Sequence, residues 1–429
     1  MIWTNSKYVG DGDVFLATER NYKYIDLNLL KKVSEIVFVD DENKYIYDNY
    51  YDKIKDIKLI GITGTNGKTT TCYLIYQMLN LMGEKASYIG TIGFYIDDMV
   101  FKLDNTTPEI SLLYNMLYYA KKRKCKVVVM EVSSHALKQD RVHGLLFDAI
   151  AITNITRDHL DYHKTLNDYI ESKKKLISMT KGKKICILNK NDKYYRHFKS
   201  KLNNNIIIGK DIKIKRIKNG LYKTNIIIKE NKKESFETPF IGLFNVYNFL
   251  YAYLIVKKLG YNSFILKDKY ILLKEPNGRM ESIKYKTNKI FVDYAHTPDA
   301  VLNVLKTVDK IKNKGIITII GCGGNRDKEK RPIMAKIACK YSSFVIFTND
   351  NPRSEDEKEI MKDILKGASN NYEVIYDRYD AIKKSISLLK NNMILMILGK
   401  GHEDYQIIKD KKIYFSDIDS VKTIIHNGK

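Results

Sequence analysis

"GITGTNGKTTT", residues 61–71, is the strongest single motif in the chain. Gly64 and Gly67 let the backbone wrap closely around phosphate groups. Lys68 supplies a positive charge, and the hydroxyl of Thr69 can bind Mg²⁺. The match to a P-loop is imperfect, because an isoleucine stands where the first glycine is usual. A strand-like run before the stretch and a helical run after it favour a phosphate-binding loop over an incidental turn.

Short apolar runs recur along the chain, and each stops at a polar or glycine-rich segment. Residues 127–130 (VVVM) run into EVSSHAL, residues 147–152 (FDAIAI) into TNITRDHLDYH, and residues 316–320 (IITII) into GCGGNRDKEKRP. Continuous apolar runs are typical of parallel strands covered on both faces. Helical stretches lie between them, such as residues 72–83, whose apolar side chains share one face before Gly83 ends it. The pattern predicts an α/β fold with its chemistry at the carboxyl ends of strands.

The chain length and the turn-forming residues between its segments predict three domains, which agrees with roughly 150 residues per domain. Residues 1–55 would form a small, truncated N-terminal α/β unit, residues 56–276 a central P-loop ATPase domain with a parallel sheet, and residues 277–429 a C-terminal Rossmann-like α/β domain. Pro276 and the Asn-Gly pair after it mark the second boundary. Residues 205–240 alternate apolar and polar positions, which predicts antiparallel strands appended to the central domain.

The bulk composition describes a globular chain of 429 residues, 44% of them hydrophobic. No apolar run approaches the roughly 18 residues that a membrane span needs, and the N-terminus lacks the layout of a signal peptide. Five scattered cysteines without a CxxC pair indicate reduced thiols in the cytoplasm. The net charge of +24 is spread along the chain, which favours compositional drift over a nucleic-acid-binding surface. We therefore expect neither a membrane nor a nucleic acid as a partner.

Two polar residues stand at the ends of the strand-like runs that follow the P-loop. Glu131 is placed to reach a Mg²⁺ beside Thr69, and His159 follows the next run. Each residue taken alone would more often be structural. Their placement on successive strand ends predicts that both bind metal ions near the phosphates.

The polar segments form an ordered series: TGTNGKTTT, EVSSHAL, TNITRDHLDYH, GLFNVYN, GRMES, VDYAHTPDA, GCGGNRDKEKRP, DNPRSE and GKGHEDYQ. In this order they resemble the Mur ligases, most closely those that add meso-diaminopimelate to UDP-N-acetylmuramoyl-L-alanyl-D-glutamate. The resemblance covers residues 56–429 and implies a monomeric, cytoplasmic ligase of peptidoglycan stem-peptide synthesis. ATP would phosphorylate the substrate carboxylate to an acyl phosphate, which the amine of the incoming amino acid attacks. Positioning and charge neutralisation would dominate such catalysis.

The resemblance also assigns residues to ATP and Mg²⁺. Asn245 and Asn248 would approach the adenine, and a carbamylated lysine, formed with CO₂, would help to hold the second Mg²⁺. Three adjacent lysines are candidates, and the spacing of one helical turn from Tyr169 selects Lys173. The ATP-binding set is Gly64, Thr65, Asn66, Gly67, Lys68, Thr69, Thr70, Asn245, Asn248, Arg279 and Asp293; the catalytic set is Lys68, Glu131, His159 and Lys173; the metal ligands are Thr69, Glu131, His159 and carbamylated Lys173.

The N-terminal region departs from the family pattern. Mur ligases have a fuller uridine-binding domain, whereas residues 1–55 retain TNSKYVGDGDVFLA and lack the segment that normally follows near TERNYKYI. Asn5 stands where aspartate is commoner. Small polar groups and one guanidinium elsewhere suit a sugar-peptide that bears carboxylates. The expected contacts with the UDP substrate are Ser6, Asn105, Thr106, Thr107, Ser133, Gln139 and Arg141.

The stretch DNPR, residues 350–353, is the motif that the resemblance links to meso-diaminopimelate, because lysine-adding members lack the arginine. The planar guanidinium of Arg353 would pair with the distal carboxylate of diaminopimelate and repel the ammonium of a lysine. Glu403 would be available to the distal ammonium. The alternative for Arg353 is a surface ion pair with Glu355 or Asp356. The expected amino-acid pocket consists of Arg326, Asp350, Asn351, Pro352, Arg353, Gly399 and Glu403.

Other functions fit parts of the sequence. The same ligase chemistry could use lysine or lanthionine as the amino acid. A folylpolyglutamate synthase would share the P-loop but would not be expected to carry DNPR or HEDYQ. A nucleic-acid-stimulated P-loop ATPase would suit the positive charge, although no base-reading module supports it. The short N-terminal region also fits a non-catalytic homologue, even though every expected catalytic position is occupied.

Overall fold

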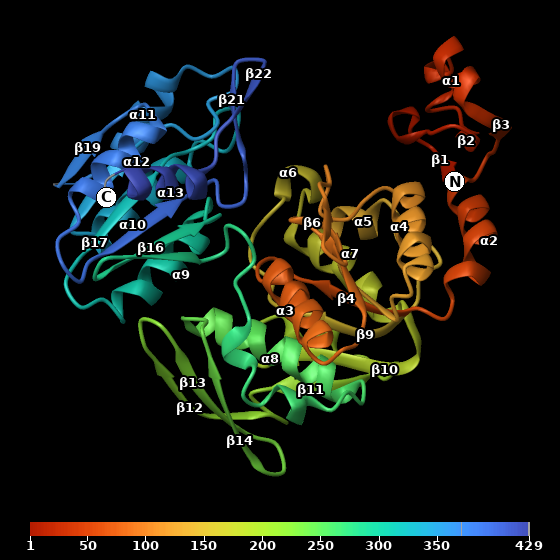
Figure 1. Ribbon diagram of the computed structural model, residues 1–429, viewed down its shortest axis with the longest axis horizontal. Coiled ribbons are helices and arrows are strands. Elements are labelled where there is room, and N and C mark those ends of the chain that lie inside the picture. Colours follow the sequence, from red (N-terminus) through yellow and green to blue (C-terminus); the bar gives the residue numbers. More distant parts are fainter. Residues whose placement is uncertain (370, 428–429) are drawn as a thin grey trace. The chain divides into compact units, whose positions relative to one another are not determined.

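The computed structural model describes residues 1–369 and 371–427 (Figure 1). The chain divides into two compact units. The first unit comprises Met1–Ile217, Ile226–Glu237 and Tyr247–Leu273, and the second comprises Lys218–Asn225, Thr238–Val246 and Lys274–Lys429. The N-terminal region thus belongs to the first unit, and the division into three domains stays a prediction.

An eight-stranded sheet forms the centre of the first unit. Its strands pair in parallel except at one end, where β5, β6 and β7 form antiparallel pairs. The P-loop follows the central strand, which has parallel neighbours on both sides. In spatial order the strands are β11 (Asn204–Ile208), β10 (Thr180–Asn189), β9 (Phe147–Ile152), β4 (Lys58–Thr63), β8 (Val127–Glu131), β5 (Ala86–Gly90), β6 (Gly93–Ile96) and β7 (Met99–Phe101).

Helices pack on this sheet as the apolar pattern predicted. Helix α3 (Lys68–Leu81) packs against β4, β5 and β8, and α7 (Leu166–Ser178) packs against β4 and β10. Helix α3 has Gly67 as its N-cap and is followed by Gly83, whose φ of 82° confirms the predicted end. The remaining helical segments of this region are α4 (Ile110–Lys122), α5 (Ser134–Lys138), α6 (Leu160–His163), η3 (Tyr195–Phe198), α8 (Leu243–Lys258), η4 (Ser263–Leu266) and η5 (Tyr270–Leu272).

The N-terminal region is a small three-stranded parallel sheet with short helices. Its strands are β1 (Ile2–Trp3), β2 (Asp13–Ala17) and β3 (Val33–Phe38), in that order. The Tyr50 hydroxyl of α2 donates to the Asn115 side chain of α4, which in turn donates to the Ile2 carbonyl. These bonds attach the small sheet to α4. The helical segments here are η1 (Ser6–Tyr8), η2 (Tyr22–Tyr24), α1 (Leu27–Lys32) and α2 (Glu42–Ile54).

The alternating segment at residues 205–240 is divided between two sheets. Strands β12 (Lys213–Asn219), β13 (Thr224–Lys229) and β14 (Lys233–Thr238) form a separate three-stranded sheet, as expected of an appended element. The expectation is wrong for the first part of the segment, because β11 pairs in parallel with β10 and extends the main sheet. Its residues Ile206 to Ile208 are buried, which is typical of a main-sheet strand and not of an alternating one.

A six-stranded sheet forms the centre of the second unit, and it is parallel apart from the β15–β16 pair. In β17 (Ile316–Ile320), Ile316 and Ile320 enter one apolar cluster and Ile317 and Ile319 enter another, so both faces of the strand are covered. Helices α9, α10 and α11 supply one cluster, and α12 and α13 supply the other. The elements are β15 (Glu281–Tyr285), β16 (Asn288–Asp293), β20 (Ile394–Leu398), β17, β18 (Phe344–Phe347), β19 (Tyr372–Val374), α9 (Pro298–Asp309), α10 (Lys330–Tyr341), α11 (Glu357–Leu365), α12 (Arg378–Ser387), α13 (Asp417–Asn427) and the hairpin β21 (Tyr405–Ile408) with β22 (Lys411–Tyr414).

Each unit therefore gathers predicted site residues at the carboxyl ends of its parallel strands. In the second unit, β16, β17, β18 and β20 are followed by the four loops in which the sequence concentrates its polar motifs. Among residues 1–369 and 371–427, no helix combines the length and the apolar character needed to cross a membrane.

Candidate active site

The P-loop between β4 and α3 has the backbone shape that its glycines predict. Gly64 has φ 144° and Gly67 has φ 86°, values that side chains other than glycine rarely adopt. A Cβ at Gly67 would also collide with the Asn248 side chain. The Lys68 Nζ donates to the Gly64 and Thr65 carbonyl oxygens, 2.9 Å from each. The loop thus presents a helix N-terminus and an ammonium together, which suits a phosphate group.

The Glu131 carboxylate lies against this loop, fully buried at the end of β8. Its Oε2 accepts a hydrogen bond from the Thr69 hydroxyl at 3.0 Å. Its Oε1 accepts bonds from the Tyr88 hydroxyl at 2.5 Å and from the Thr91 backbone N–H at 2.9 Å. The structure therefore brings two of the predicted metal ligands together and fixes the carboxylate with neutral donors.

The Lys173 ammonium reaches the same loop from α7. The side chain is 1% exposed, and its Nζ donates to the Gly64 carbonyl at 2.9 Å and lies 4.5 Å from the centre of the Tyr169 ring. Burial lowers the pKa of Lys173 well below its usual value, and the nearby charge of Lys68 lowers it further. The next two lysines are exposed: Lys174 pairs with Glu171 at 3.2 Å, and Lys175 donates to a main-chain carbonyl. Of the three lysines, only the one selected by spacing lies at the P-loop.

The His159 side chain is half exposed, just before α6, on a backbone with φ 52°. It lies 3.4 Å from the Asp158 carboxylate, and its ring centre is 4.9 Å from that of His135 and 6.4 Å from that of Tyr169. Over residues 1–369 and 371–427 no group of three or more His, Cys, Asp or Glu side chains is arranged to hold a metal ion. The four-member metal set thus stays a prediction.

Several predicted contacts of the UDP substrate adjoin the Glu131 strand end. The Thr107 hydroxyl donates to the Glu131 carbonyl at 2.8 Å and accepts from the Ser133 N–H at 3.0 Å. The Arg141 guanidinium donates to the Thr107 carbonyl at 2.9 Å. The Thr106 hydroxyl is 3.0 Å from that of Thr91, and Gln139 donates to Tyr162 at 3.0 Å.

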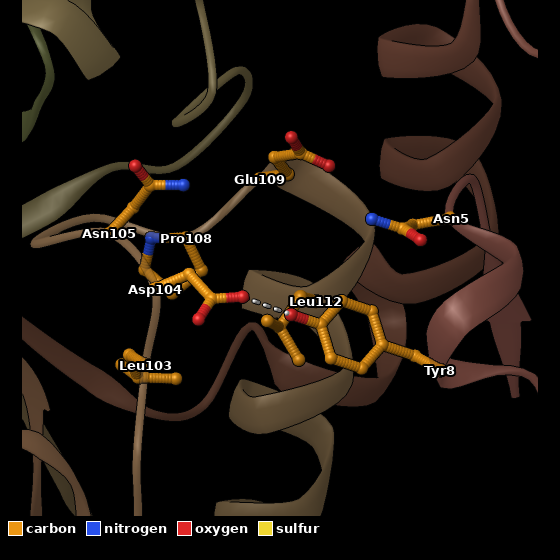
Figure 2. A pocket seen from close by; sticks show the side chains of 8 residues that line it. All are labelled: Asn5, Tyr8, Leu103, Asp104, Asn105, Pro108, Glu109 and Leu112. Atoms are coloured by element: carbon orange, nitrogen blue, oxygen red, sulfur yellow. Dashed lines mark hydrogen bonds between the residues drawn. The ribbon is translucent and has the colours of Figure 1, made fainter. Parts of the chain in front are cut away.

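The other two predicted contacts lie toward the N-terminal region. Asn105 lines a surface pocket between the residue 103–112 segment and the first 3₁₀ helix, shown in Figure 2. The Tyr8 hydroxyl closes part of this pocket by donating to the Asp104 carboxylate at 3.3 Å. Ser6 is exposed beside it, while its neighbour Asn5 lines the pocket.

Two predicted ATP residues of the second unit also lie together. Asp293, at the end of β16, is buried and accepts hydrogen bonds from the backbone N–H groups of Met280 (2.7 Å) and Ala295 (2.8 Å). Burial raises the pKa of Asp293, and the Arg279 charge opposes that rise. The Arg279 guanidinium lies 4.5 Å from the centre of the Tyr294 ring. Asn245, also in this unit, donates to the Ile241 carbonyl at 3.1 Å.

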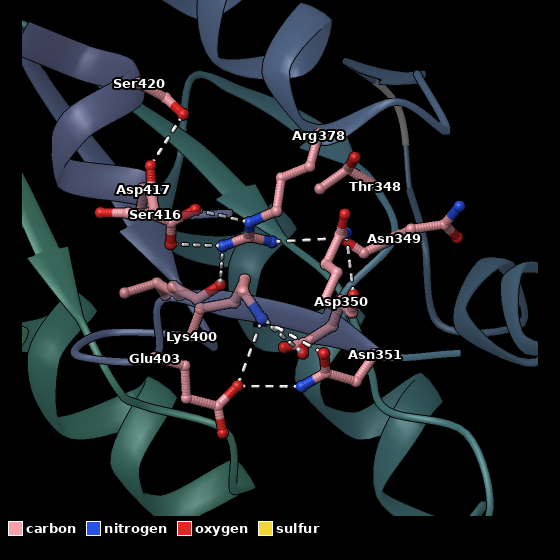
Figure 3. A network of polar contacts seen from close by, with 12 residues as sticks. Thr348, Asn349, Asp350, Asn351, Arg378, Lys400, Glu403, Ser416, Asp417 and Ser420 are labelled. Atoms are coloured by element: carbon pink, nitrogen blue, oxygen red, sulfur yellow. Dashed lines mark hydrogen bonds and ion pairs between the residues drawn. The ribbon is translucent and has the colours of Figure 1, made fainter. Parts of the chain in front are cut away.

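The turn after β18 contains residues 350–353 of the predicted amino-acid pocket and is hydrogen-bonded to the loop after β20 (Figure 3). The Asn351 amide donates to Glu403 at 2.9 Å and accepts from the Lys400 ammonium at 3.3 Å. Lys400 is fully buried and pairs with Glu403 at 3.2 Å. Glu403, predicted to meet a substrate ammonium, already has a lysine partner. Gly399 has φ 118°, and a Cβ there would lie 2.6 Å from the Asp350 carboxylate.

Arg353 occupies the tip of this turn with φ 54°. Its Nη1 donates to the carbonyls of Gly324 at 2.9 Å and Asn351 at 3.4 Å. Over the described residues, its Nε and Nη2 have no hydrogen-bond partner, and it forms no ion pair. The alternative pairing with Glu355 or Asp356 does not occur: Glu355 binds Arg331, and Asp356 caps α11. Arg326 is exposed on the loop after β17.

Some residues of the site were missed by the sequence analysis. Tyr88 and Thr91 hold the Glu131 carboxylate, and Lys400 holds Glu403. Thr91 follows an apolar run that stops at a Gly-Thr segment, which is the same signal that identified the other loops. Tyr88 and Lys400 gave no such signal, because Tyr88 meets Glu131 from another strand and Lys400 meets Asn351 from another loop.

Comparison with known proteins agrees with this arrangement of a P-loop unit followed by a second α/β unit. Residues 62–256 match the Mur ligase middle domain, and residues 278–401 match the glutamate ligase domain of Mur ligases. The chain belongs to the Mur ligase family and is an ATP-dependent ligase. The nine ordered motifs had predicted this membership, which is thus confirmed.

The relatives include UDP-N-acetylmuramoyl-L-alanyl-D-glutamate–2,6-diaminopimelate ligases. That of Aquifex aeolicus is 38% identical, over 99% of this chain and 93% of its own length. That of Fusobacterium nucleatum is 41% identical, over 90% of this chain and 81% of its own. A solved structure of a ligase with this name has a TM-score of 0.71 and 28% identity, and the match covers 100% of this chain and 94% of that one.

Proposed function

We propose that the chain joins meso-diaminopimelate to UDP-N-acetylmuramoyl-L-alanyl-D-glutamate, with ATP as the energy source, in peptidoglycan stem-peptide synthesis. The main support is Arg353 in the Asp350–Arg353 turn. Over the described residues, the Nε and Nη2 groups of Arg353 have no hydrogen-bond partner. A guanidinium edge of this kind suits a carboxylate. The shared name of relatives that match 90% or more of this chain supports the same substrate.

The reaction needs an activated carboxylate. The terminal phosphoryl group of ATP would pass to a carboxylate oxygen of the dipeptide, giving an acyl phosphate and ADP. The amine of the incoming amino acid would then attack the carbonyl carbon, and phosphate would leave as the nitrogen loses a proton. Lys68 and the backbone N–H groups of the P-loop would bind the phosphates. This assignment rests on the loop geometry, which places the Lys68 ammonium and the start of α3 side by side.

The donor set beside the loop fits Mg²⁺, which prefers oxygen ligands. Thr69 and Glu131 offer a hydroxyl and a carboxylate 3.0 Å apart, and a carbamate on Lys173 would add another oxygen donor. When bound, the metal would neutralise negative charge on the phosphates. Carbamate formation requires a neutral amine, and the lowered pKa of Lys173 favours that form. The role of His159 as a further metal ligand stays a proposal.

The UDP-linked substrate would be bound by Thr106, Thr107, Ser133 and Arg141 near Glu131, and by Ser6 and Asn105 at the N-terminal pocket. We further expect a monomer that acts in the cytoplasm, without a nucleic acid partner. All five cysteines are free thiols, which supports a reducing compartment.

The direct test is the mass of the product formed with the UDP-dipeptide, ATP, Mg²⁺ and equal amounts of meso-diaminopimelate, lysine and lanthionine. We expect the diaminopimelate adduct to predominate. Equal turnover with lysine would contradict the proposed substrate but leave the ligase chemistry intact. ATP hydrolysis that depends on DNA or RNA, and falls steeply with salt, would instead support the nucleic-acid-stimulated ATPase.

A further inference from the structure

A buried guanidinium joins three segments beneath the predicted amino-acid pocket. Arg331, at the start of α10, is fully buried. Its two terminal nitrogens donate to the Glu355 carboxylate oxygens at 2.8 and 2.7 Å. It also contacts Asp363 of α11 at 3.0 Å and the Gly323 carbonyl at 3.3 Å. Arg331 therefore connects the loop after β17, the turn after β18 and helix α11.

Glu355 extends this connection to the backbone of the loop after β17. One of its oxygens accepts the Asn325 N–H at 2.8 Å, and the other lies 3.2 Å from the Lys328 ammonium. Hydrogen bonding to Arg331 is the main reason that the pKa of Glu355 falls to about 2, so the carboxylate is charged at neutral pH. A single charged group thus holds both the guanidinium and the loop.

Above this pair, the loop and the turn are hydrogen-bonded to each other. The Gly324 N–H donates to the Asn351 carbonyl at 2.9 Å, and the Arg353 guanidinium donates to the Gly324 carbonyl at 2.9 Å. The Asn325 side chain donates to the Ser354 hydroxyl at 2.7 Å. Residues Asn325 and Arg353 both have φ 54°, a conformation that persists only where the surroundings hold it.

We infer that Arg331 and Glu355 are positioning residues that fix Arg326 and Arg353 relative to each other, and thereby set selectivity for an amino acid with a second carboxylate. This inference rests on the proposed function. Arg326 lies next to Asn325 on the loop, and Arg353 lies two residues before Glu355 on the turn. A shift in the Arg331–Glu355 pair would therefore move both guanidinium groups that the substrate meets.

Stability alone is a poor reason for a buried pair of this kind. Taking a guanidinium and its carboxylates out of water costs much of what their attraction returns, so well-packed apolar residues often serve as well. What the charged pair adds is geometry, because a bidentate contact fixes distance and angle together. Loss of that geometry at an active site is expected to affect substrate binding before it affects folding.

The test uses two variants of the full chain. Arg331→Lys keeps the charge but cannot donate to both Glu355 oxygens and to Gly323. Glu355→Gln keeps the size of the side chain and removes its charge. It disrupts the same pair, so the experiment can still be done if Arg331→Lys fails to fold. Glu359→Gln is the matched control, since Glu359 is an exposed carboxylate of α11 whose contact with Lys362, at 3.7 Å, is on the surface.

We expect both variants to raise the KM for meso-diaminopimelate about ten-fold or more, with the KM for ATP within about two-fold of the parent value. The ratio of kcat/KM for meso-diaminopimelate over that for lysine should fall by a similar factor. In an Arg353→Ala background, Arg331→Lys should have a smaller further effect, because only Arg326 is then left to be displaced. The control should match the parent chain in every measurement.

Three results would overturn the inference: an unchanged KM for meso-diaminopimelate, parallel increases in both KM values, or effects that add fully in the Arg353→Ala background. These outcomes leave the proposed function standing. If instead the parent chain ligates no diamino acid at all, the proposed function fails, and the inference fails with it.

Discussion

The phosphate loop of the first unit and the amino-acid turn of the second unit hold their cations in different ways. At the phosphate loop, Lys68 and Lys173 both donate to the Gly64 carbonyl oxygen. Around the turn, Lys400 pairs with the Glu403 carboxylate and Arg378 with the Asp417 carboxylate (Figure 3). Arg331 pairs in the same way with Glu355.

We interpret this difference in terms of function. Side chains bonded to a carbonyl can exchange that partner for a ligand, whereas side chains paired with a carboxylate keep the surrounding loops in place. A carbonyl is a neutral acceptor, so an arriving phosphate or carbamate can replace it without leaving a charge unpaired. A buried carboxylate cannot be replaced so readily, because its removal leaves a charge in a low dielectric. On the proposed function, the first unit would take up charged ligands, and the second would hold Arg353 in one place to bind a substrate carboxylate.

The largest predicted effect is at Lys173. Lys173→Ala should lower the ligation rate by roughly a hundred- to a thousand-fold, because it removes the proposed carbamate from the phosphate loop. Added formate or acetate should restore part of the rate. Lys174→Ala is the control, since that neighbour is exposed and pairs with Glu171. Full activity of Lys173→Ala in a steady-state assay would refute the carbamate.

The second effect is at Arg353. A charge-assisted contact with a carboxylate contributes about 1.5–3 kcal/mol, so Arg353→Ala should raise the KM for meso-diaminopimelate roughly ten- to a hundred-fold. The KM for ATP should change little. Steady-state kinetics with each substrate varied in turn make the measurement. If both KM values rise equally, Arg353 is a scaffold residue of the second unit and not a reader of the substrate.

Alanine substitutions at two glycines can distinguish the cost of backbone strain from the cost of steric crowding at the phosphate loop. Gly67 and Gly83 have nearly equal φ values, 86° and 82°, but a Cβ at Gly67 would strike Asn248, whereas nothing lies within 4 Å of a Cβ at Gly83. Gly83→Ala should cost about 1–2 kcal/mol of unfolding free energy from strain alone. Gly67→Ala should cost more and also raise the KM for ATP. Urea unfolding and ATP kinetics of the two variants test this expectation. If the two variants lose the same unfolding free energy and have the same KM for ATP, crowding against Asn248 does not contribute.

The smallest effect is on the pH dependence of stability. The pKa of Glu355 falls from its usual 4.5 to about 2 in the folded chain. A depressed folded-state pKa stabilises the fold fully above the unfolded pKa, and this contribution is lost as the pH falls toward 2. The difference in unfolding free energy between the parent chain and Glu355→Gln should be constant above about pH 5 and shrink below about pH 4.5. A gap that stays constant down to pH 3 would show that Glu355 is not stabilised by Arg331.

The phosphate loop was predictable from sequence because its geometry is local. Two glycines, a lysine and a threonine within six residues specify the turn, and one helical turn from Tyr169 selects Lys173. The turn at Arg353 was predictable from its motif, but the side chains that hold the turn in place were not. Arg331 and Glu355 are 24 residues apart and meet only because β17 and β18 pair in parallel. Likewise, the Lys400–Glu403 pair depends on Asn351, which arrives from a distant loop.

The prediction for strand β11 was wrong because only the local alternation of its sequence was considered. Its sequence, at residues 204–208, continues into an alternating segment and so was grouped with it. Its pairing with β10 places three consecutive isoleucines in the buried part of the main sheet. Period-two alternation over a long window does not locate the point at which the chain leaves one sheet for another.

We propose that Arg353 selects the incoming amino acid, and a competition between two amino acids measures this selection. The parent chain and Arg353→Ala would each receive the UDP-dipeptide, ATP, Mg²⁺ and an equal mixture of meso-diaminopimelate and lysine, and the products would be weighed by mass spectrometry. We expect a large excess of the diaminopimelate product from the parent chain, and a ratio of diaminopimelate to lysine product that is about ten-fold or more lower in the variant. The same product ratio from both chains would contradict it.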